Sequence, residues 1–186
     1  MFRRKPFLFI FSSLTIITLL LATSPTIPVQ AAGTLYAQPT ATGVGNCSSW
    51  ADACTLQTAL TTATSGDEIW VMQGTYIPGS NRSDTFQLVY NVGVYGGFDG
   101  AETARNQRNP GTNITILSGD INGDDTGLVI DSSIQNNGEN NYHVVTVSSP
   151  SYFYAVLDGF TITAGNANGS GDDQVWGWNV HRRYSG

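Results

Sequence analysis

Short runs of strand-forming residues recur in this chain at intervals of about twenty to thirty residues, between stretches rich in Gly, Asn, Asp and Thr. The runs lie at residues 68–72, 92–96, 113–117, 143–147 and 157–162. Recurrence in this range is typical of solenoids, in which each repeat packs only on its neighbours. Because little helix fits between the runs, we expect an all-β fold whose strands stack as the rungs of a parallel β-helix.

One segment before the first run has a helical pattern. Four apolar residues lie at i, i+3, i+4 and i+7, on one face of a helix: Leu56, Ala59, Leu60 and Ala63. We expect a short helix near residues 55–64 that caps the first rung, because the ends of a solenoid must be covered. An ordinary amphipathic helix packed on a sheet is the alternative.

The segment between the first two runs and the loops that follow also have recognisable patterns. Apolar residues alternate strictly from Phe86 to Val94, which predicts one extended segment with one buried face. We expect loops at 99–112 and 119–142, and the second is long and rich in Asp, Asn and Gly. Long loops inside compact domains are commonly functional.

The first residues have the organisation of an export signal. Basic residues at 3–5 precede an uncharged apolar stretch at 7–22, and Ala31 and Ala32 offer small residues to a peptidase. We expect cleavage after Ala31 or Ala32, giving a secreted or cell-surface protein without a transmembrane segment. An uncleaved anchor is the alternative, although the apolar stretch is shorter than the roughly 20 residues that a spanning helix needs.

The last residues depart in composition from the rest of the chain. Residues 171–186 contain two tryptophans and paired arginines and have neither a helical nor a strand pattern. Because a solenoid needs a terminal cap, we interpret this tail as the product of a frameshift or truncation, with a genuine floppy C-terminus as the alternative. The chain thus divides into four parts: a signal peptide at 1–32, an N-terminal strand and capping helix at 33–65, rungs at 66–170 and an atypical tail at 171–186.

Charge and cysteine content limit the partners and the compartment. Removing residues 1–32 leaves five basic and fourteen acidic residues, a formal charge of −9, and no lysine. Such a surface argues against nucleic acid and against polyanionic ligands, which Lys and Arg must neutralise. The two cysteines, Cys47 and Cys54, follow the leader, and in an exported chain they indicate one disulfide. Two cysteine ligands alone cannot fill a zinc site, which argues against metal binding by Cys47 and Cys54.

Several motifs follow one another along the chain in a set order: Gly-Asp-Glu-Ile-Trp-Val at 66–71 with Gly-Thr-Tyr at 74–76, Tyr-Gly-Gly-Phe at 95–98, Ile-Leu-Ser-Gly-Asp at 116–120, Leu-Asp-Gly-Phe-Thr-Ile at 157–162 and Gly-Asn-Ala at 165–167. In these motifs the chain resembles the N-terminal part of secreted bacterial surface proteins of the pectin-lyase-like superfamily. The resemblance covers about residues 34–170. It implies a right-handed parallel β-helix with many more rungs, and it implies no particular activity.

The acidic stretch 120–131 is the best candidate for a binding site. Oxygen-bearing side chains occupy its first, third, fifth and twelfth positions, the spacing of a calcium loop: Asp120, Asn122, Asp124 and Asp131. The sixth position, where such a loop has Gly, is Asp125, and the twelfth residue is shorter than the usual Glu. We expect a solvated, turn-rich loop without a cofactor, and the alternative is a calcium ion held by these four residues.

We predict no catalytic residue. A lyase of this fold needs an arginine or lysine base, and between the predicted signal and the tail the basic residues are Arg82, Arg105 and Arg108. Hydrolysis needs carboxylates that flank the glycosidic bond, and Asp172 and Asp173 match that requirement only faintly. Seven aromatic residues offer a surface on which a sugar could stack, or else fill the cap and the core: Trp50, Trp70, Tyr90, Tyr95, Tyr152, Phe153 and Tyr154.

Together these patterns favour a non-catalytic protein of the cell surface or the extracellular space. Its β-helix would serve as a stalk, or would bind a polysaccharide or another surface protein. One alternative is a fragment of a polysaccharide lyase or glycoside hydrolase whose catalytic rungs lie beyond residue 186. Another is a truncation product without function.

Overall fold

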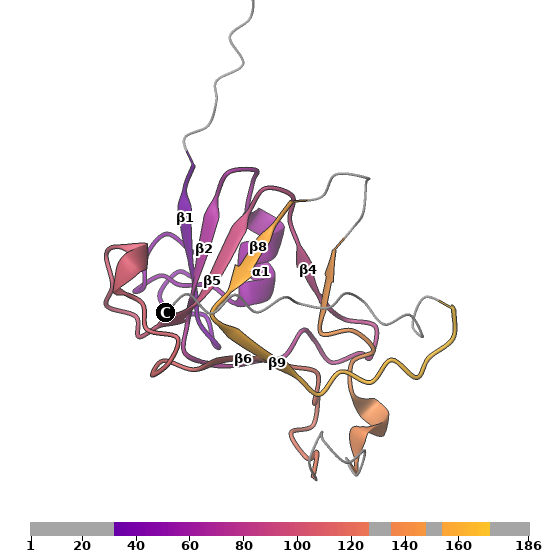
Figure 1. Cartoon of the computed structure of the whole chain (residues 1–186). Helices are drawn as coiled ribbons and strands as arrows, with labels where there is room; N and C mark the ends of the chain where they lie inside the picture. Colours follow the sequence, from indigo (N-terminus) through magenta and orange to yellow (C-terminus); the bar gives the residue numbers. More distant parts are fainter. Residues whose placement is uncertain (1–31, 127–134, 148–153, 172–186) are drawn as a thin grey trace, which may run out of the picture. The chain divides into compact units, whose positions relative to one another are not determined.

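Parallel strands dominate the structure, which is a computed structural model that describes residues 32–126, 135–147 and 154–171 (Figure 1). The strands within these residues are β1 (Thr34–Ala37), β2 (Glu68–Met72), β3 (Gly74–Tyr76), β4 (Phe86–Leu88), β5 (Gly93–Phe98), β6 (Thr115–Ser118), β7 (Val145–Val147), β8 (Val156–Asp158) and β9 (Phe160–Thr163). The helical segments are the α-helix α1 (Leu56–Thr62) and the 3-10 turns η1 (Arg105–Gln107) and η2 (Asn137–Glu139). The predicted all-β, parallel character is therefore confirmed for the described residues.

The strands form three sheets that the chain visits in a repeated order. The first sheet has the strand order β1-β2-β5-β8, the second β3-β6-β9 and the third β4-β7, and every pairing within them is parallel. From β2 onward, consecutive strands pass from the first sheet to the second, then to the third, and back to the first. Each return places a strand directly beside the one laid down on the previous circuit.

Register decides which side chains face the core. In the first sheet Leu35, Ile69, Val94 and Leu157 lie side by side on successive strands. Ile69 and Val94 are buried in one apolar cluster with residues of the other two sheets, including Leu117 and Phe86. Since side chains alternate along a strand, the neighbouring positions point away from this cluster. The three sheets thus share a single core.

A glycine makes the sharp corner between β8 and β9. Gly159 has a φ of +85°, which side-chain-bearing residues rarely adopt, and a Cβ there would lie 2.7 Å from the carbonyl oxygen of Gly96. The predicted single run at 157–162 is therefore two strands in different sheets. The chain turns the corner within one residue because Gly159 allows both the conformation and the close approach.

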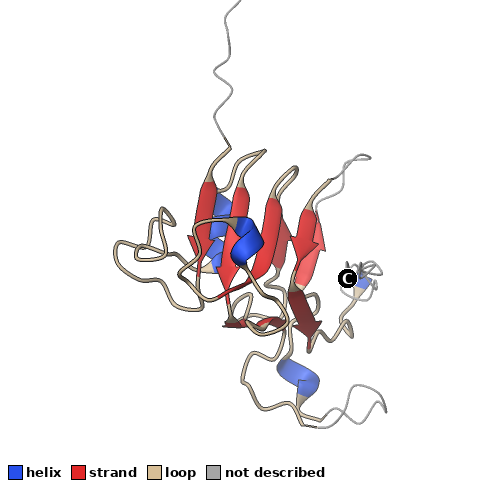
Figure 2. Ribbon diagram, turned by 60° about the vertical axis from the view of Figure 1, so that its left-hand side comes forward, coloured by secondary structure: helices blue, strands red, loops and turns tan. Residues whose placement is uncertain are grey.

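The helix α1 takes the place of further strands between β1 and β2. The hydroxyl oxygen of Thr55 caps its start by accepting a hydrogen bond from the backbone nitrogen of Thr58 at 3.2 Å. Its buried face, Leu56, Ala59 and Leu60, is the predicted one, and the helix contacts β1, β2 and β4. Figure 2 shows α1 and η1 on opposite sides of the first sheet.

A disulfide ties the segment before α1 to β1. Cys47 and Cys54 are joined and almost fully buried, as their place after the leader predicted. The backbone nitrogen of Tyr36 donates to the carbonyl of Cys47 at 2.9 Å, and Tyr36 accepts from the nitrogen of Cys54 at 3.0 Å. The bridge therefore fixes a loop that already pairs with the first strand.

Some local predictions are wrong. The alternation from Phe86 to Val94 is not one extended segment, because the chain turns near Asn91, whose φ is +56°, and continues in another sheet. The strand β3 has no counterpart among the predicted runs, since its three residues are too few to show a period. The run at 68–72 has the predicted bounds, and the expected N-terminal strand within 33–65 is β1.

The ends of the chain lie outside the described residues. Residues 1–31, with the predicted signal and its cleavage residue Ala31, belong to that part, as do residues 172–186, which make up almost all of the predicted tail. Among the residues that are described, no helix is both long and apolar enough to cross a membrane.

Candidate functional site

The acidic loop after β6 is folded around the carboxylate of Asp120. Oδ1 of Asp120 accepts hydrogen bonds from the backbone nitrogens of Gly123 at 2.7 Å and Asp124 at 3.1 Å, and Oδ2 accepts from that of Asp125 at 3.1 Å. Gly123 adopts a φ of +71° within this turn. The loop therefore curls back on its own first residue, which brings three carboxylates together.

A second segment, residues 135–140, closes on this loop. Thr126 and Gln135 exchange backbone hydrogen bonds of 2.8 and 3.3 Å, and Nδ2 of Asn136 donates to the carbonyl of Asp124 at 3.2 Å. Nδ2 of Asn140 donates to Oδ2 of Asp125 at 2.7 Å. These contacts place Glu139, the last residue of η2, beside the loop.

Four carboxylates consequently form one group: Asp120, Asp124, Asp125 and Glu139. One oxygen from each lies within 4.8 Å of all the others. Two ion pairs occur among the described residues, Arg105 with Glu68 and Arg108 with Asp158, and neither includes a member of this group. The group thus concentrates negative charge without a basic side chain to balance it.

The group overlaps the predicted calcium set only in part. Asp120 and Asp124 belong to both, whereas Asn122 is exposed and is not in the group. Asp131 lies outside the described residues. The sequence pattern missed Asp125, which it counted as a defect at the sixth position, and Glu139, which only the approach of the two segments brings near. A loop motif cannot reveal a ligand that arrives from another part of the chain.

Arg82 fixes the position of the second segment, residues 135–140, through several contacts. Its Nε donates to the carbonyl of Asn140 at 2.8 Å, and its guanidinium lies over the ring of Tyr142, 4.2 Å from the centroid. Its Nη2 also donates to the carbonyl of Asn166 at 3.3 Å. Asn141, fully buried, donates from Nδ2 to the carbonyl of Asn81 at 2.7 Å. The loop after β3 and the segment after β9 are thereby fastened to the acidic group.

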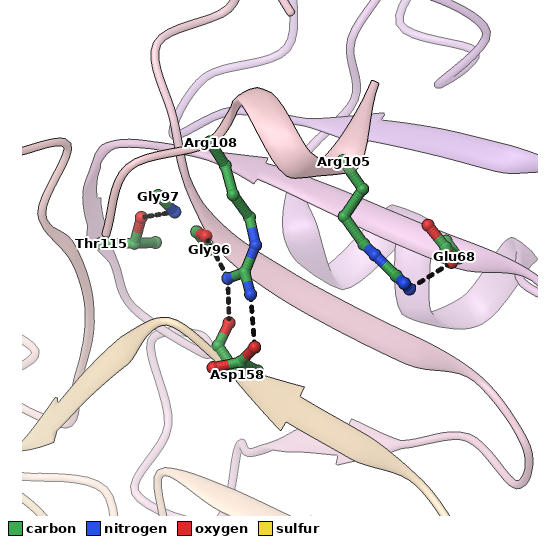
Figure 3. A network of polar contacts seen from close by, with 7 residues as sticks. All are labelled: Glu68, Gly96, Gly97, Arg105, Arg108, Thr115 and Asp158. Atoms are coloured by element: carbon green, nitrogen blue, oxygen red, sulfur yellow. Dashed lines mark hydrogen bonds and ion pairs between the residues drawn. The ribbon is translucent and has the colours of Figure 1, made fainter. Parts of the chain in front are cut away.

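Arg105 and Arg108, the other arginines among the described residues, lie on the outer face of the first sheet (Figure 3). Nη1 of Arg108 donates to the carbonyls of Gly96 at 3.0 Å and Asp158 at 3.4 Å, and its Nη2 pairs with the Asp158 carboxylate. Nη1 of Arg105 pairs with Oε1 of Glu68 at 2.6 Å. Both arginines come from the predicted loop at 99–112, and they fix that loop across strands β2, β5 and β8.

Tyr95 lies between these two arginines. The guanidinium carbons of Arg105 and Arg108 are 4.5 and 5.3 Å from the centre of its ring. Burial raises the pKa of the Tyr95 phenol, and the two positive charges oppose that rise only in part. Tyr95 therefore stays neutral at physiological pH and acts as a surface on which the cations pack.

Two of the predicted aromatic residues, Trp50 and Trp70, pack in one cluster with Tyr36 and Phe98 and so offer no open platform. Trp70 is buried and stacks on Phe98, with ring centroids 4.9 Å apart, and Trp50 contacts both Tyr36 and Phe98. The indole nitrogen of Trp50 donates to the carbonyl of Glu102 at 3.0 Å. This cluster lies on the outer side of the first sheet, where it anchors the 99–112 loop. Tyr152 and Phe153 lie outside the described residues.

Two tyrosines remain exposed on neighbouring turns. Tyr90 and Tyr154 are both exposed, Tyr154 to 63%, and the carbonyl of Tyr154 accepts from the nitrogen of Asn91 at 2.6 Å. Tyr154 borders a shallow hollow of 160 Å³ that Glu68, Asn91 and Tyr95 also line. The hollow combines aromatic rings with a carboxylate and a carboxamide, which is the mixture that polar ligands with apolar faces require.

The two histidines and the aspartates at 172 and 173 add no catalytic set within the described part of the chain. His143 is half-buried and lies two residues before β7. Asp172, Asp173 and His181 lie outside the described residues. Comparison of the chain with family models, with curated proteins and with solved structures finds no match.

Proposed function

We propose that this chain is an exported right-handed parallel β-helix protein of the pectin-lyase-like kind. It acts at the cell surface or outside the cell as a structural or adhesive module that binds carbohydrate, and it is not an enzyme. The observation that carries the proposal is the repeated order in which the chain visits its three parallel sheets.

The positions of the sequence motifs support the resemblance on which this proposal rests. The motif pairs at 66–76 and 157–162 both span the passage from the first sheet to the second, β2 to β3 and β8 to β9. Equivalent motifs therefore occupy equivalent corners on different circuits, as repeats of one coil do. The disulfide between Cys47 and Cys54 supports export, because disulfides persist mainly in oxidising compartments.

The arginines support a structural rather than a catalytic use of this coil. A lyase base must be able to take a proton from its substrate. Arg82 is held by backbone carbonyls and a tyrosine ring, and Arg105 and Arg108 are held by carboxylates and by Tyr95. Each arginine thus fastens a loop to the sheets.

The hollow beside Tyr154 supports carbohydrate as the ligand. Tyr154 presents an exposed ring, and the carboxylate of Glu68 and the carboxamide of Asn91 lie around the same hollow, where sugar hydroxyls could be bonded. The acidic character of the chain favours neutral over uronate-rich polysaccharides.

Sedimentation of the full chain with insoluble cellulose, with xylan and with de-esterified pectin tests the proposal. We expect retention on a neutral polysaccharide, and Tyr154→Ala should weaken it about tenfold, the factor for about 1.4 kcal/mol. Ile114→Ala, which removes another exposed apolar side chain that does not line the hollow, is the control and should bind as the parent does.

Three outcomes count against the proposal. Failure to bind any polysaccharide, or equal losses in Tyr154→Ala and Ile114→Ala, would remove carbohydrate binding at this hollow. Release of unsaturated or reducing sugar ends during the incubation would instead favour a lyase or a hydrolase.

A further inference from the structure

We propose that the carboxylates of Asp120, Asp124, Asp125 and Glu139, together with the carboxamide of Asn140, form a calcium site. The ion joins the loop that follows β6 to the segment 135–140. The site is independent of the carbohydrate-binding role, because none of its residues lines the hollow beside Tyr154.

Four carboxylates held so close together need a counter-charge. Their oxygens lie within 4.8 Å of one another, and no arginine among the described residues forms an ion pair with any of them. Negative charges at this separation repel one another, and a bound cation offsets that repulsion. The backbone amides that bond Asp120 shape the loop, but they supply partners to only one of the four carboxylates.

A second observation, independent of the charge, points to the same ion. The side chain of Asn140 is 1% exposed and reaches Asp125 through Nδ2, yet its own Oδ1 is buried without a hydrogen-bond partner among the described residues. Oδ1 of Asp125 and Oε1 of Glu139 are buried and unpartnered in the same way. Buried polar atoms in proteins are almost always satisfied, so three exceptions among the residues of this one group and its partner Asn140 require an explanation.

All three unsatisfied atoms are oxygens, and this decides the kind of ligand. Acceptors without donors are satisfied by a cation or by water, whereas an anion or an apolar ligand would leave them unpaired. The four nearby carboxylates favour the cation, because water carries no charge to offset theirs. A purely oxygen-based set selects hard ions such as Ca²⁺ or Mg²⁺, because Zn²⁺ prefers nitrogen and sulfur.

The kind of coordination favours calcium over magnesium. Oxygens on opposite sides of Ca²⁺ are about 4.8 Å apart, twice its usual ligand distance of about 2.4 Å, and the observed limit of 4.8 Å accommodates this ion. Mg²⁺ demands near-ideal octahedral geometry and keeps several waters, so a set of four carboxylates suits it less well. Two segments that approach each other in a turn-rich region also match the flexible coordination that calcium accepts.

Calorimetric titration of the full chain, first stripped with EDTA, tests the proposal. We expect one saturable Ca²⁺ site with a Kd of about 10⁻⁴ to 10⁻³ M, the range of extracellular calcium modules. Glu139→Gln and, separately, Asp125→Asn should each weaken binding about tenfold or more, because each replaces a charged ligand by a neutral one.

Asp99→Asn is the matched control. It also removes one negative charge, from an exposed carboxylate that is not part of the group, and its Kd should stay within about twofold of the parent value. Far-ultraviolet circular dichroism of each variant confirms folding, and the parent titration alone remains decisive if a variant does not fold. The proposal fails if the parent shows no saturable Ca²⁺ binding below about 10 mM, if equimolar Mg²⁺ displaces Ca²⁺, or if Glu139→Gln binds as Asp99→Asn does.

Discussion

The third sheet shows how differently the two ends of the strand stack are covered. Its strands β4 and β7 are paired in register, Phe86 with Val145 and Leu88 with Val147. In β4, which α1 contacts, Leu88 is 9% exposed, whereas its partner Val147 in β7 is 36% exposed. The strands carry similar apolar residues, so their burial reflects what covers them. A rung of stacked strands is buried only when something lies on both of its sides.

The first and second sheets follow the same rule. β8 and β9 are the last strands of their sheets, and Leu157, Phe160 and Ile162 on them are half-buried or exposed. Ile69 and Val71, on a strand with neighbours on both sides, are fully buried. Stability within the described residues should therefore decrease from the helix-covered end toward β8 and β9.

The largest predicted difference in stability comes from truncating two isoleucines, one on the inner strand β2 and one on the last strand β9. Ile69→Ala should destabilise the fold by about 2–5 kcal/mol, because it leaves a cavity at a site that is 0% exposed. Ile162→Ala removes the same atoms at a site that is 38% exposed and should cost less than about 1 kcal/mol. Urea unfolding of both variants measures the difference, and equal losses would contradict the comparison.

The disulfide, which lies at the helix-covered end, should add to the free energy of unfolding there. Replacing Cys47 and Cys54 together by Ala should lower the free energy of unfolding by about 2–3 kcal/mol, the range for a short closed loop. Dithiothreitol should lower the melting temperature of the parent to about that of the double variant. It should leave the melting temperature of the double variant unchanged. A parent that melts identically with and without reductant would show that the bridge contributes nothing.

A buried carboxylate at the same end should make stability depend on acid. Asp67 accepts hydrogen bonds from the backbone nitrogens of Gly33 and Thr64, both at 2.7 Å, and from the Thr64 hydroxyl at 2.9 Å. Burial alone would raise its pKa, but these donors outweigh burial and lower the pKa of the carboxyl. The stability that the Asp67 carboxylate provides is therefore fully present above the unfolded-state pKa of about 3.9. It is lost as the pH falls through the lower pKa that this carboxyl has in the folded protein.

Asp67→Asn tests this contribution directly. The variant should lose about 1–3 kcal/mol at pH 7, where the parent carboxylate is ionised and bonded. As the pH falls below about 4, the parent loses the same interaction, so the difference between the two proteins should shrink. Urea unfolding at pH 7 and pH 3 measures both values, and a difference that grows in acid would contradict the assignment.

The matching change at the other end should have the smallest effect. Asp158 is about half exposed and pairs with Arg108, so Asp158→Asn should cost about 0.2–1 kcal/mol, as exposed ion pairs usually do. The loss should be smaller still in about 0.5 M salt, because salt at that concentration screens exposed ion pairs. If Asp158→Asn lowered the free energy of unfolding as much as Asp67→Asn does, the expected difference in stability between the two ends would be contradicted.

Local patterns in the sequence predicted the helix and the longer strands well. Alternation gave β2 its bounds, helical spacing gave the buried face of α1, and the position of the cysteines gave the disulfide. Alternation failed between Phe86 and Val94, because the turn at Asn91 does not change the polarity pattern. β3 was missed because it is too short to show a period.

The acidic group was less predictable than the strands. Asp120 and Asp124 lie in one loop, and their spacing alone identified them. Glu139 and Asn140 reach that loop only because Arg82 and the bridge between Thr126 and Gln135 position their segment. Contacts between distant segments depend on the whole fold, and no spacing rule within one loop contains them.

Native-state hydrogen exchange of the full chain, read by mass spectrometry, measures how protection varies from the helix-covered end to β8 and β9. We expect the amides of β2 and β5, which have paired strands on both sides, to exchange slowest. Amides of β8 and β9 should exchange at least about tenfold faster, which corresponds to about 1.4 kcal/mol less protection. Equal protection of β8 and β2 would contradict a stack that is covered at one end and loosens toward the other.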